Sequence, residues 1–226
     1  HDELVRMAEE KFGHLPNHTA KLLQPAHFKG GEFRAQKDLE QVHFTLALEG
    51  PTYRDNAIYT AQVYASIIGG GMSSRLFQEI REKRGLCYTV FAQAGAHEDT
   101  GMITLYAGTA ADQIGDLARV SIDELRRAAD DISDAEVERA RVQMKAGMLM
   151  GLESPSNRAE RLARMVSIWG RVPKLDEVVD KIDAVDTASV RAMAGDLAGN
   201  ANSAMALYGP IDSAPSLEEL KARLAA

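Results

Sequence analysis

Residues 69–88 constrain the fold more than any other part of this 226-residue chain. They begin with three consecutive glycines, Gly69, Gly70 and Gly71, which end the amphipathic pattern before them. A short helix with an apolar side is predicted next, capped by Ser73 or Ser74. Gly85 stands where a helix-ending glycine is expected, and a strand follows at once. A helix, a sharp reversal and a strand must therefore pack together within a short segment.

This segment carries Arg81 near the end of its helix and Tyr88 at the start of its strand. A purely structural interpretation is available for both. Arg81 belongs to a basic last turn, where positive charge offsets the helix dipole by about 0.3–1 kcal/mol. Tyr88 alternates with Leu86 and Val90, as a core strand residue does. The spacing alone favours this interpretation.

A functional interpretation rests on how the reversal at Gly85 folds the chain. Arg81 follows Phe77 by four residues, so it flanks the apolar side of the helix rather than its wet side. If the strand folds back beside the helix end, the guanidinium of Arg81 and the phenol of Tyr88 converge. Such a pair can bind a peptide carbonyl and stabilise the negative charge that develops on it.

The glycine run itself gives a weaker signal. Gly69-x-Gly71-x-x-Ser74 resembles a truncated dinucleotide fingerprint, but a helix is predicted before it where the fingerprint needs a strand. We therefore do not expect nucleotide binding. The glycines indicate instead a helix-to-helix connection that needs unusual backbone angles or a close backbone approach.

Composition excludes several other classes of function. The net charge of −7 disfavours nucleic acid and anionic membranes as partners. The single cysteine, Cys87, excludes an internal disulfide and is expected to be buried and structural. His14 and His18 flank Pro16 in an aperiodic stretch, so no metal site is expected in the chain. Without an apolar run of ~18 residues, a soluble and cytoplasmic protein is favoured.

The rest of the chain predicts three parts and an α+β fold. Residues 1–13 are expected to be the last helix of a preceding, mostly absent half, and residues 14–31 a linker. Residues 32–226 are expected to form one domain, in which an antiparallel-rich sheet is covered by helices. Strands are predicted at 32–37, 42–48, 86–96, 102–108 and 204–208, and helices at 56–68, 114–125, 133–150, 154–169, 175–185, 188–197 and 217–224.

The sequence Gly-Gly-Gly-Met-Ser-Ser-Arg-Leu-Phe-Gln-Glu-Ile-Arg-Glu-Lys-Arg-Gly-Leu-Cys-Tyr at 69–88 resembles a family signature. It is the signature in the C-terminal half of zinc metallopeptidases of the pitrilysin, insulinase and mitochondrial processing peptidase type. The resemblance covers nearly the whole chain, and residues 32–226 are similar to the α+β roll of that half. Cys87 departs from the small residue that the family usually has at this position.

The resemblance implies an endopeptidase built from two related halves that enclose a chamber. The first half holds zinc with an inverted His-x-x-Glu-His motif, which this chain lacks. Carried onto this sequence, Arg81 would hold a main-chain carbonyl of the peptide substrate, and Tyr88 would donate its hydroxyl to the scissile carbonyl as it becomes an oxyanion. Gly70 and Gly71 would also contact the substrate. Zinc is expected only in the missing half.

The implied partners are a peptide substrate and a zinc-binding half. That half is either linked upstream or a separate subunit, which includes the case of a homodimer, and the chain alone is expected to be inactive. An alternative is a non-catalytic scaffold or substrate-recognition subunit, as in respiratory core proteins of the same architecture. A His-x-x-Glu-His motif upstream of residue 1 would distinguish the peptidase from the scaffold.

Overall fold

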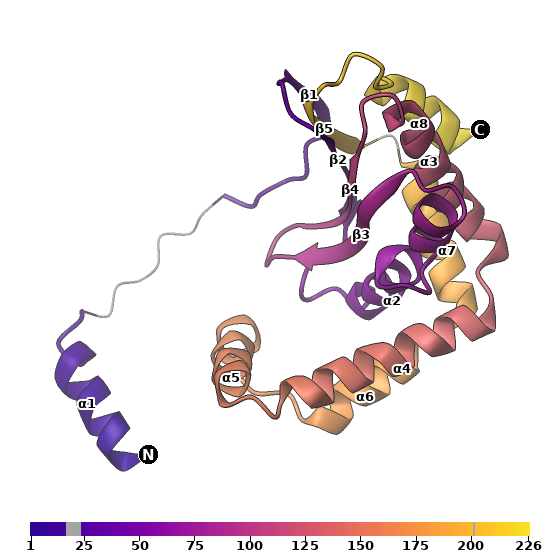
Figure 1. Ribbon diagram of the computed structural model, residues 1–226. Helices are drawn as coiled ribbons and strands as arrows, with labels where there is room; N and C mark the ends of the chain where they lie inside the picture. Colours follow the sequence, from indigo (N-terminus) through magenta and orange to yellow (C-terminus); the bar gives the residue numbers. More distant parts are fainter. Residues whose placement is uncertain (17–23, 201) are drawn as a thin grey trace.

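A computed structural model describes residues 1–16, 24–200 and 202–226. Its centre is one five-stranded sheet (Figure 1). Only the pair β1–β5 is parallel, and the other neighbouring pairs are antiparallel. The predicted α+β class with an antiparallel-rich sheet is confirmed. In spatial order the strands are β1 (Gly31–Gln36), β5 (Ser203–Gly209), β2 (Val42–Gly50), β4 (Gly101–Thr109) and β3 (Cys87–Ala96).

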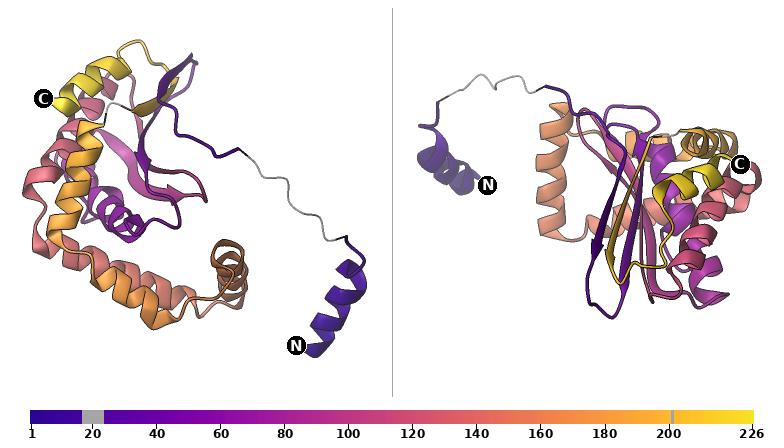
Figure 2. Two further views of the ribbon diagram at one scale, coloured as in Figure 1. Left: turned by 180° about the vertical axis from the view of Figure 1, so that it is seen from behind. Right: turned by 90° about the horizontal axis from the view of Figure 1, so that it is seen from above.

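The sheet buries one face against a layer of helices. Along β2, Val42 and Phe44 are completely buried, whereas His43 and Thr45 between them are half-buried. This alternation follows from the two-residue period of a strand with one covered face. Figures 1 and 2 show the helices that cover this face gathered on one side of the sheet. The covering helices are α2 (Ile58–Gly69), α3 (Ile114–Asp131), α7 (Thr187–Gly199) and α8 (Leu217–Ala225).

Three further helices form an arm that extends past the sheet. α4 (Asp134–Gly151) and α6 (Leu175–Asp183) lie side by side and carry α5 (Pro155–Trp169) beyond the helix layer (Figures 1 and 2). A capping box between Ser133 and Glu136 opens α4, at the start of the helix predicted over 133–150. No residue of α5 is buried.

The N-terminal helix α1 (Asp2–Phe12) also has no buried residue and stands apart from the sheet in Figure 1. Residues 17–23 of the predicted linker lie outside the described residues, and the division at residues 13 and 31 stays a prediction. None of the described helices has both the length and the apolar character that crossing a lipid bilayer requires.

Candidate functional site

The helix that follows the glycine run is wound as a π-helix, η1 (Phe77–Glu82). Its wider winding is seen where the N–H of Lys83 donates to the carbonyl of Gln78, five residues back, at 3.0 Å. Short π-helical turns are frequent at functional sites. The expected serine cap was wrong: no side chain caps η1, and Ser74 is buried with its hydroxyl unpaired among the described residues.

Gly85 turns the chain from η1 into β3. Its φ of +63° is left-handed, a conformation that glycine adopts without steric cost. Two backbone hydrogen bonds close the helix here, from Gly85 N–H to Arg81 O at 3.1 Å and from Leu86 N–H to Ile80 O at 2.9 Å. The hydroxyl of Thr109 on β4 then donates to the carbonyl of Leu86 at 2.6 Å. The reversal predicted at Gly85 is therefore fixed on both sides.

Tyr88 is the extra residue of a β-bulge at the start of β3. Cys87 pairs with Thr109 and Thr89 pairs with Gly108, so Tyr88 has no partner on β4. A bulge re-aims the side chain of the unpaired residue. Tyr88 is 75% exposed, which makes the core-strand interpretation of this residue wrong.

Arg81 and Tyr88 meet on the surface. The Cζ atom of Arg81 lies 4.9 Å from the centre of the Tyr88 ring and 4.7 Å from that of Phe77. The predicted convergence of guanidinium and phenol is thus confirmed. Contacts of this kind contribute about 0.5–1 kcal/mol at exposed positions, enough to bias the arginine toward one orientation.

The charges around Arg81 leave its own charge uncompensated. Lys83 and Arg84 both donate to the carboxylate of Glu79, and these hydrogen bonds lower the pKa of Glu79. Within the described residues, the only carboxylate within 4.0 Å of the Arg81 guanidinium is that of Glu82, at that limit. Glu79 is therefore engaged by Lys83 and Arg84 rather than by Arg81, and the N–H groups of Arg81 stay available to a ligand.

Cys87 is unsuited to be a nucleophile. It is half-buried, and burial raises the pKa of its thiol to about 11 although the charge of Arg81 opposes the change. A raised pKa keeps the thiol protonated at neutral pH, which disfavours a nucleophilic role.

The glycine run brings α2 against β3. A Cβ added to Gly69 would lie 2.2 Å from the backbone nitrogen of Ala92, so the close approach predicted for this run is real. The alternative of unusual backbone angles is wrong, because none of the three glycines has a positive φ. Gly70 and Gly71 are exposed, and a Cβ on Gly71 would meet nothing within 4 Å. Their contact with substrate stays a prediction.

The residues that the structure describes do not form a zinc site. Across residues 1–16, 24–200 and 202–226, no group of three or more His, Cys, Asp or Glu side chains could hold a metal ion. His43 is half-buried, and its Nδ1 is 2.8 Å from the hydroxyl of Tyr106, while His18 lies outside the described residues.

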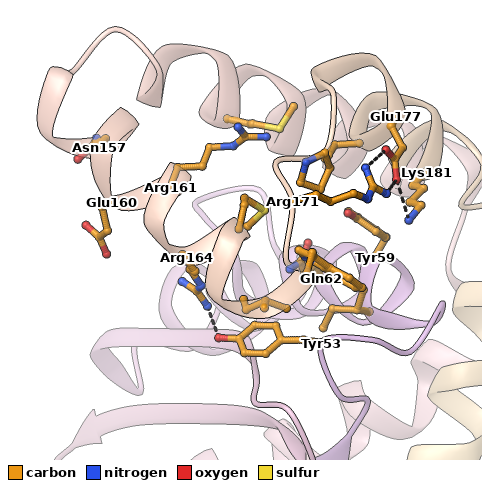
Figure 3. A pocket seen from close by; sticks show the side chains of 17 residues that line it. Tyr53, Tyr59, Gln62, Asn157, Glu160, Arg161, Arg164, Arg171, Glu177 and Lys181 are labelled. Carbon is orange, nitrogen blue, oxygen red and sulfur yellow. Dashed lines mark hydrogen bonds and ion pairs between the residues drawn. The ribbon is translucent and has the colours of Figure 1, made fainter. Parts of the chain in front are cut away.

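Sequence reasoning missed a cavity of about 430 Å³ between α5, α6 and the start of α2 (Figure 3). Arg81 and Tyr88 do not line it. Its side chains come from segments far apart in the sequence, and each segment taken alone has only the spacing of an ordinary helix. No local pattern could have identified it.

Comparison with known proteins decides the family. Residues 1–144 match the family model described as the peptidase M16 inactive domain. The chain belongs to the peptidase M16 family. An uncharacterised zinc protease of Rickettsia bellii is 36% identical over 84% of this chain and 46% of its own length. A second, YmxG of Bacillus subtilis, is 32% identical over 95% of the chain and 53% of its own length. The M16 chain thus spans about half the length of these relatives.

A solved structure supports the fold assignment. A chain of complex III from Candida albicans, with Inz-5 bound, superposes with a TM-score of 0.88 at 24% identity. The match covers 100% of this M16 chain and 56% of the other. At this identity the likeness concerns the fold.

Proposed function

We propose that this M16 chain is the substrate-contacting half of a zinc-dependent endopeptidase. The observation that carries the proposal is the pairing of Arg81 with the exposed Tyr88, 4.9 Å from guanidinium carbon to ring centre. Names of relatives as zinc proteases support the reaction class. The zinc-bearing half would be linked upstream or be a separate subunit, and the cytoplasm is the proposed compartment.

The two side chains have complementary tasks in this proposal. The guanidinium of Arg81 donates N–H groups to a main-chain carbonyl of the peptide and so positions it. The hydroxyl of Tyr88 donates to the oxygen of the scissile carbonyl, where negative charge develops during attack by water. The π-helix and the bulge hold both donors in place before substrate arrives, and preorganised donors of this kind are worth about 10²–10³ in turnover.

Zinc would be supplied by the other half. The described residues of this chain form no group that could hold the metal. The part of the mechanism that belongs to this chain is limited to binding the peptide and stabilising the oxyanion.

Replacement of Tyr88 by phenylalanine in the protein assembled with its zinc-bearing half tests the oxyanion role. Y88F removes only the hydroxyl and keeps the ring against Arg81. We expect kcat on a quenched fluorescent peptide to fall about 10²–10³-fold, with KM nearly unchanged, because the hydrogen bond forms mainly in the transition state. Cleavage at the wild-type rate would refute this role.

The role of Arg81 is tested by R81A, which is expected to raise KM as well as lower kcat, because a ground-state contact is lost. Tyr208 provides the matched control for Y88F. It is exposed on β5, three strand spacings or about 14 Å across the sheet from β3. Y208F should leave both constants unchanged. Absence of activity in the unmodified assembly, together with no bound zinc, would favour the scaffold alternative.

A further inference from the structure

The cavity beneath α5 has the features of a ligand site that the proposed function does not use. Its volume of about 430 Å³ lies in the range of small-molecule pockets. The aromatic side chains of Tyr53 and Tyr59 face it (Figure 3), and Trp169 at the end of α5 also lines it. It shares no residue with the pair Arg81 and Tyr88.

One face of α5 lines this cavity. The lining positions Arg161, Arg164, Met165 and Ile168 are three or four residues apart, so they lie along one side of the helix. Because no residue of α5 is buried, this side does not pack tightly onto the body of the protein. The space between α5 and α2 is therefore open to a ligand.

The charges on the wall formed by α6 are paired within the protein. Glu177 receives two hydrogen bonds from Arg171, at 2.7 and 2.8 Å, and its carboxylate lies 3.7 Å from the Lys181 ammonium. Lys181 also lies 5.9 Å from the ring centres of both Tyr59 and Trp169. The two cations thus share one carboxylate, and each already has a partner.

The wall formed by α5 is not neutralised. Within the described residues, neither Arg161 nor Arg164 has a carboxylate within 4.0 Å, although Glu160 also lines the cavity. Arg164 donates to the hydroxyl of Tyr53, a neutral group, and lies over its ring at 5.2 Å. Figure 3 shows Arg161 directed to another part of the cavity than Arg164, so this wall presents two separate guanidinium charges to a ligand.

The charged side chains that line the cavity are also positive in sum. Four basic side chains (Arg161, Arg164, Arg171 and Lys181) and two acidic ones (Glu160 and Glu177) line the cavity, a local net charge of +2 in a chain of net charge −7. The remaining lining includes Met165, Ile168 and Trp169, which offer apolar contact. A ligand that matches this lining has one anionic group and an apolar body.

We propose that this cavity binds a carboxylate carried on an apolar body. The carboxylate pairs with Arg161, in the bidentate geometry that guanidinium groups favour, Arg164 adds a second positive charge on the same wall, and the body lies against Trp169 and Met165. Two sources have this chemistry: a free fatty acid, and the C-terminal carboxylate of a peptide that ends in apolar residues.

Trp169 makes the binding measurable, because it is the only tryptophan of the chain and lines the cavity. Its fluorescence is followed in the 226-residue chain during titration with decanoate, below the concentration at which decanoate forms micelles. Decanol is the neutral counterpart. A second pair of probes is an acetylated peptide ending in Leu-Phe with a free carboxylate and the same peptide with an amide end.

We expect at least one carboxylate probe to change the fluorescence saturably and to bind about tenfold or more tightly than its neutral counterpart. Saturation by decanoate identifies the fatty acid, and saturation by the peptide acid identifies the peptide terminus. The proposal would be overturned if neither carboxylate probe changed the fluorescence saturably, or if the neutral counterparts bound equally well. Because the titration uses the wild-type chain, its outcome does not depend on whether a variant folds.

Variants then locate the carboxylate. R161Q and R164Q are each expected to weaken binding about tenfold. R158Q is the control, because Arg158 is an exposed arginine of the same helix that does not line the cavity. An equal loss of affinity in R158Q would show that the general charge of α5, rather than this site, attracts the probe, and would also overturn the proposal.

Discussion

Arg75 and Arg81 belong to the same short motif but have different environments. The side chain of Arg75 is 11% exposed, and its guanidinium bonds to both oxygens of Glu136, at 2.7 and 3.0 Å, and to Asp131. The side chain of Arg81 is 35% exposed and has a carboxylate only at the 4.0 Å limit. Arg75 therefore fixes the start of the motif to α3 and α4, whereas Arg81 keeps its donors for a ligand.

Glu136 should make an acid-sensitive contribution to stability. Although burial opposes the change, hydrogen bonds from Arg75 and from Ser133 lower the pKa of Glu136 from 4.5 to about 2. Because the pKa is lower in the folded than in the unfolded state, the contribution is complete above about pH 5 and is lost as the pH falls toward 2. Its size is roughly 3 kcal/mol at pH 7.

We therefore expect E136Q to lower the free energy of unfolding by roughly 3 kcal/mol at pH 7 and by only about 1 kcal/mol near pH 3, measured with urea. E138Q is the control on the same helix. Glu138 pairs with Arg141 but is 56% exposed, so its loss should cost under about 1 kcal/mol. An equal loss in E136Q at both pH values would show that the ionised carboxylate is not the source of the stability.

At the level of elements, the contact between α2 and β3 depends on Gly69. A methyl group at this position would lie 2.2 Å from the nitrogen of Ala92 and 2.8 Å from its Cβ, and backbone atoms of a strand cannot move aside freely. We expect G69A to destabilise the protein by about 1–3 kcal/mol, seen as a lower midpoint of thermal unfolding.

G71A separates packing from conformation in the same run of glycines. Its new methyl group meets nothing within 4 Å and Gly71 has no positive φ, so the change in stability should stay within about 0.5 kcal/mol. If G69A had the same midpoint of thermal unfolding as G71A and the wild type, the close approach of α2 and β3 would not be a source of stability.

Local signals predicted most elements, because their causes are local. The capping box of Ser133 and Glu136 opens α4, and Ser154 with Pro155 opens α5, where helices were predicted over 133–150 and 154–169. The π winding of η1 and the bulge at Tyr88 could not be predicted. Both arise from the fit between η1, β3 and β4, so alternation alone placed Tyr88 in the core, although the residue is exposed.

For the molecule as a whole, the sheet and its helix layer were predicted correctly, whereas the arm of α4, α5 and α6 was not predicted. The sequence of α5 has the spacing of a packed amphipathic helix, and yet no residue of it is buried. Likewise, the convergence of Arg81 and Tyr88 followed from the turn at Gly85, whereas the cavity under α5 depends on how the arm is placed. The pair could be predicted because a local turn brings it together, whereas the cavity could not, because it depends on tertiary placement.

This uneven burial predicts uneven stability across the molecule. Opening α5 exposes little apolar surface, and an isolated helix of 15 residues is marginal in water, whereas opening α3 exposes core residues such as Leu117 and Ile122. Hydrogen exchange followed by mass spectrometry should therefore be at least tenfold faster in α5 than in α3. α8 is the control, because it has only 9 residues but buries three leucines, and it should exchange more slowly than the longer α5. Exchange in α5 as slow as in α3 would mean that another surface covers this helix in solution.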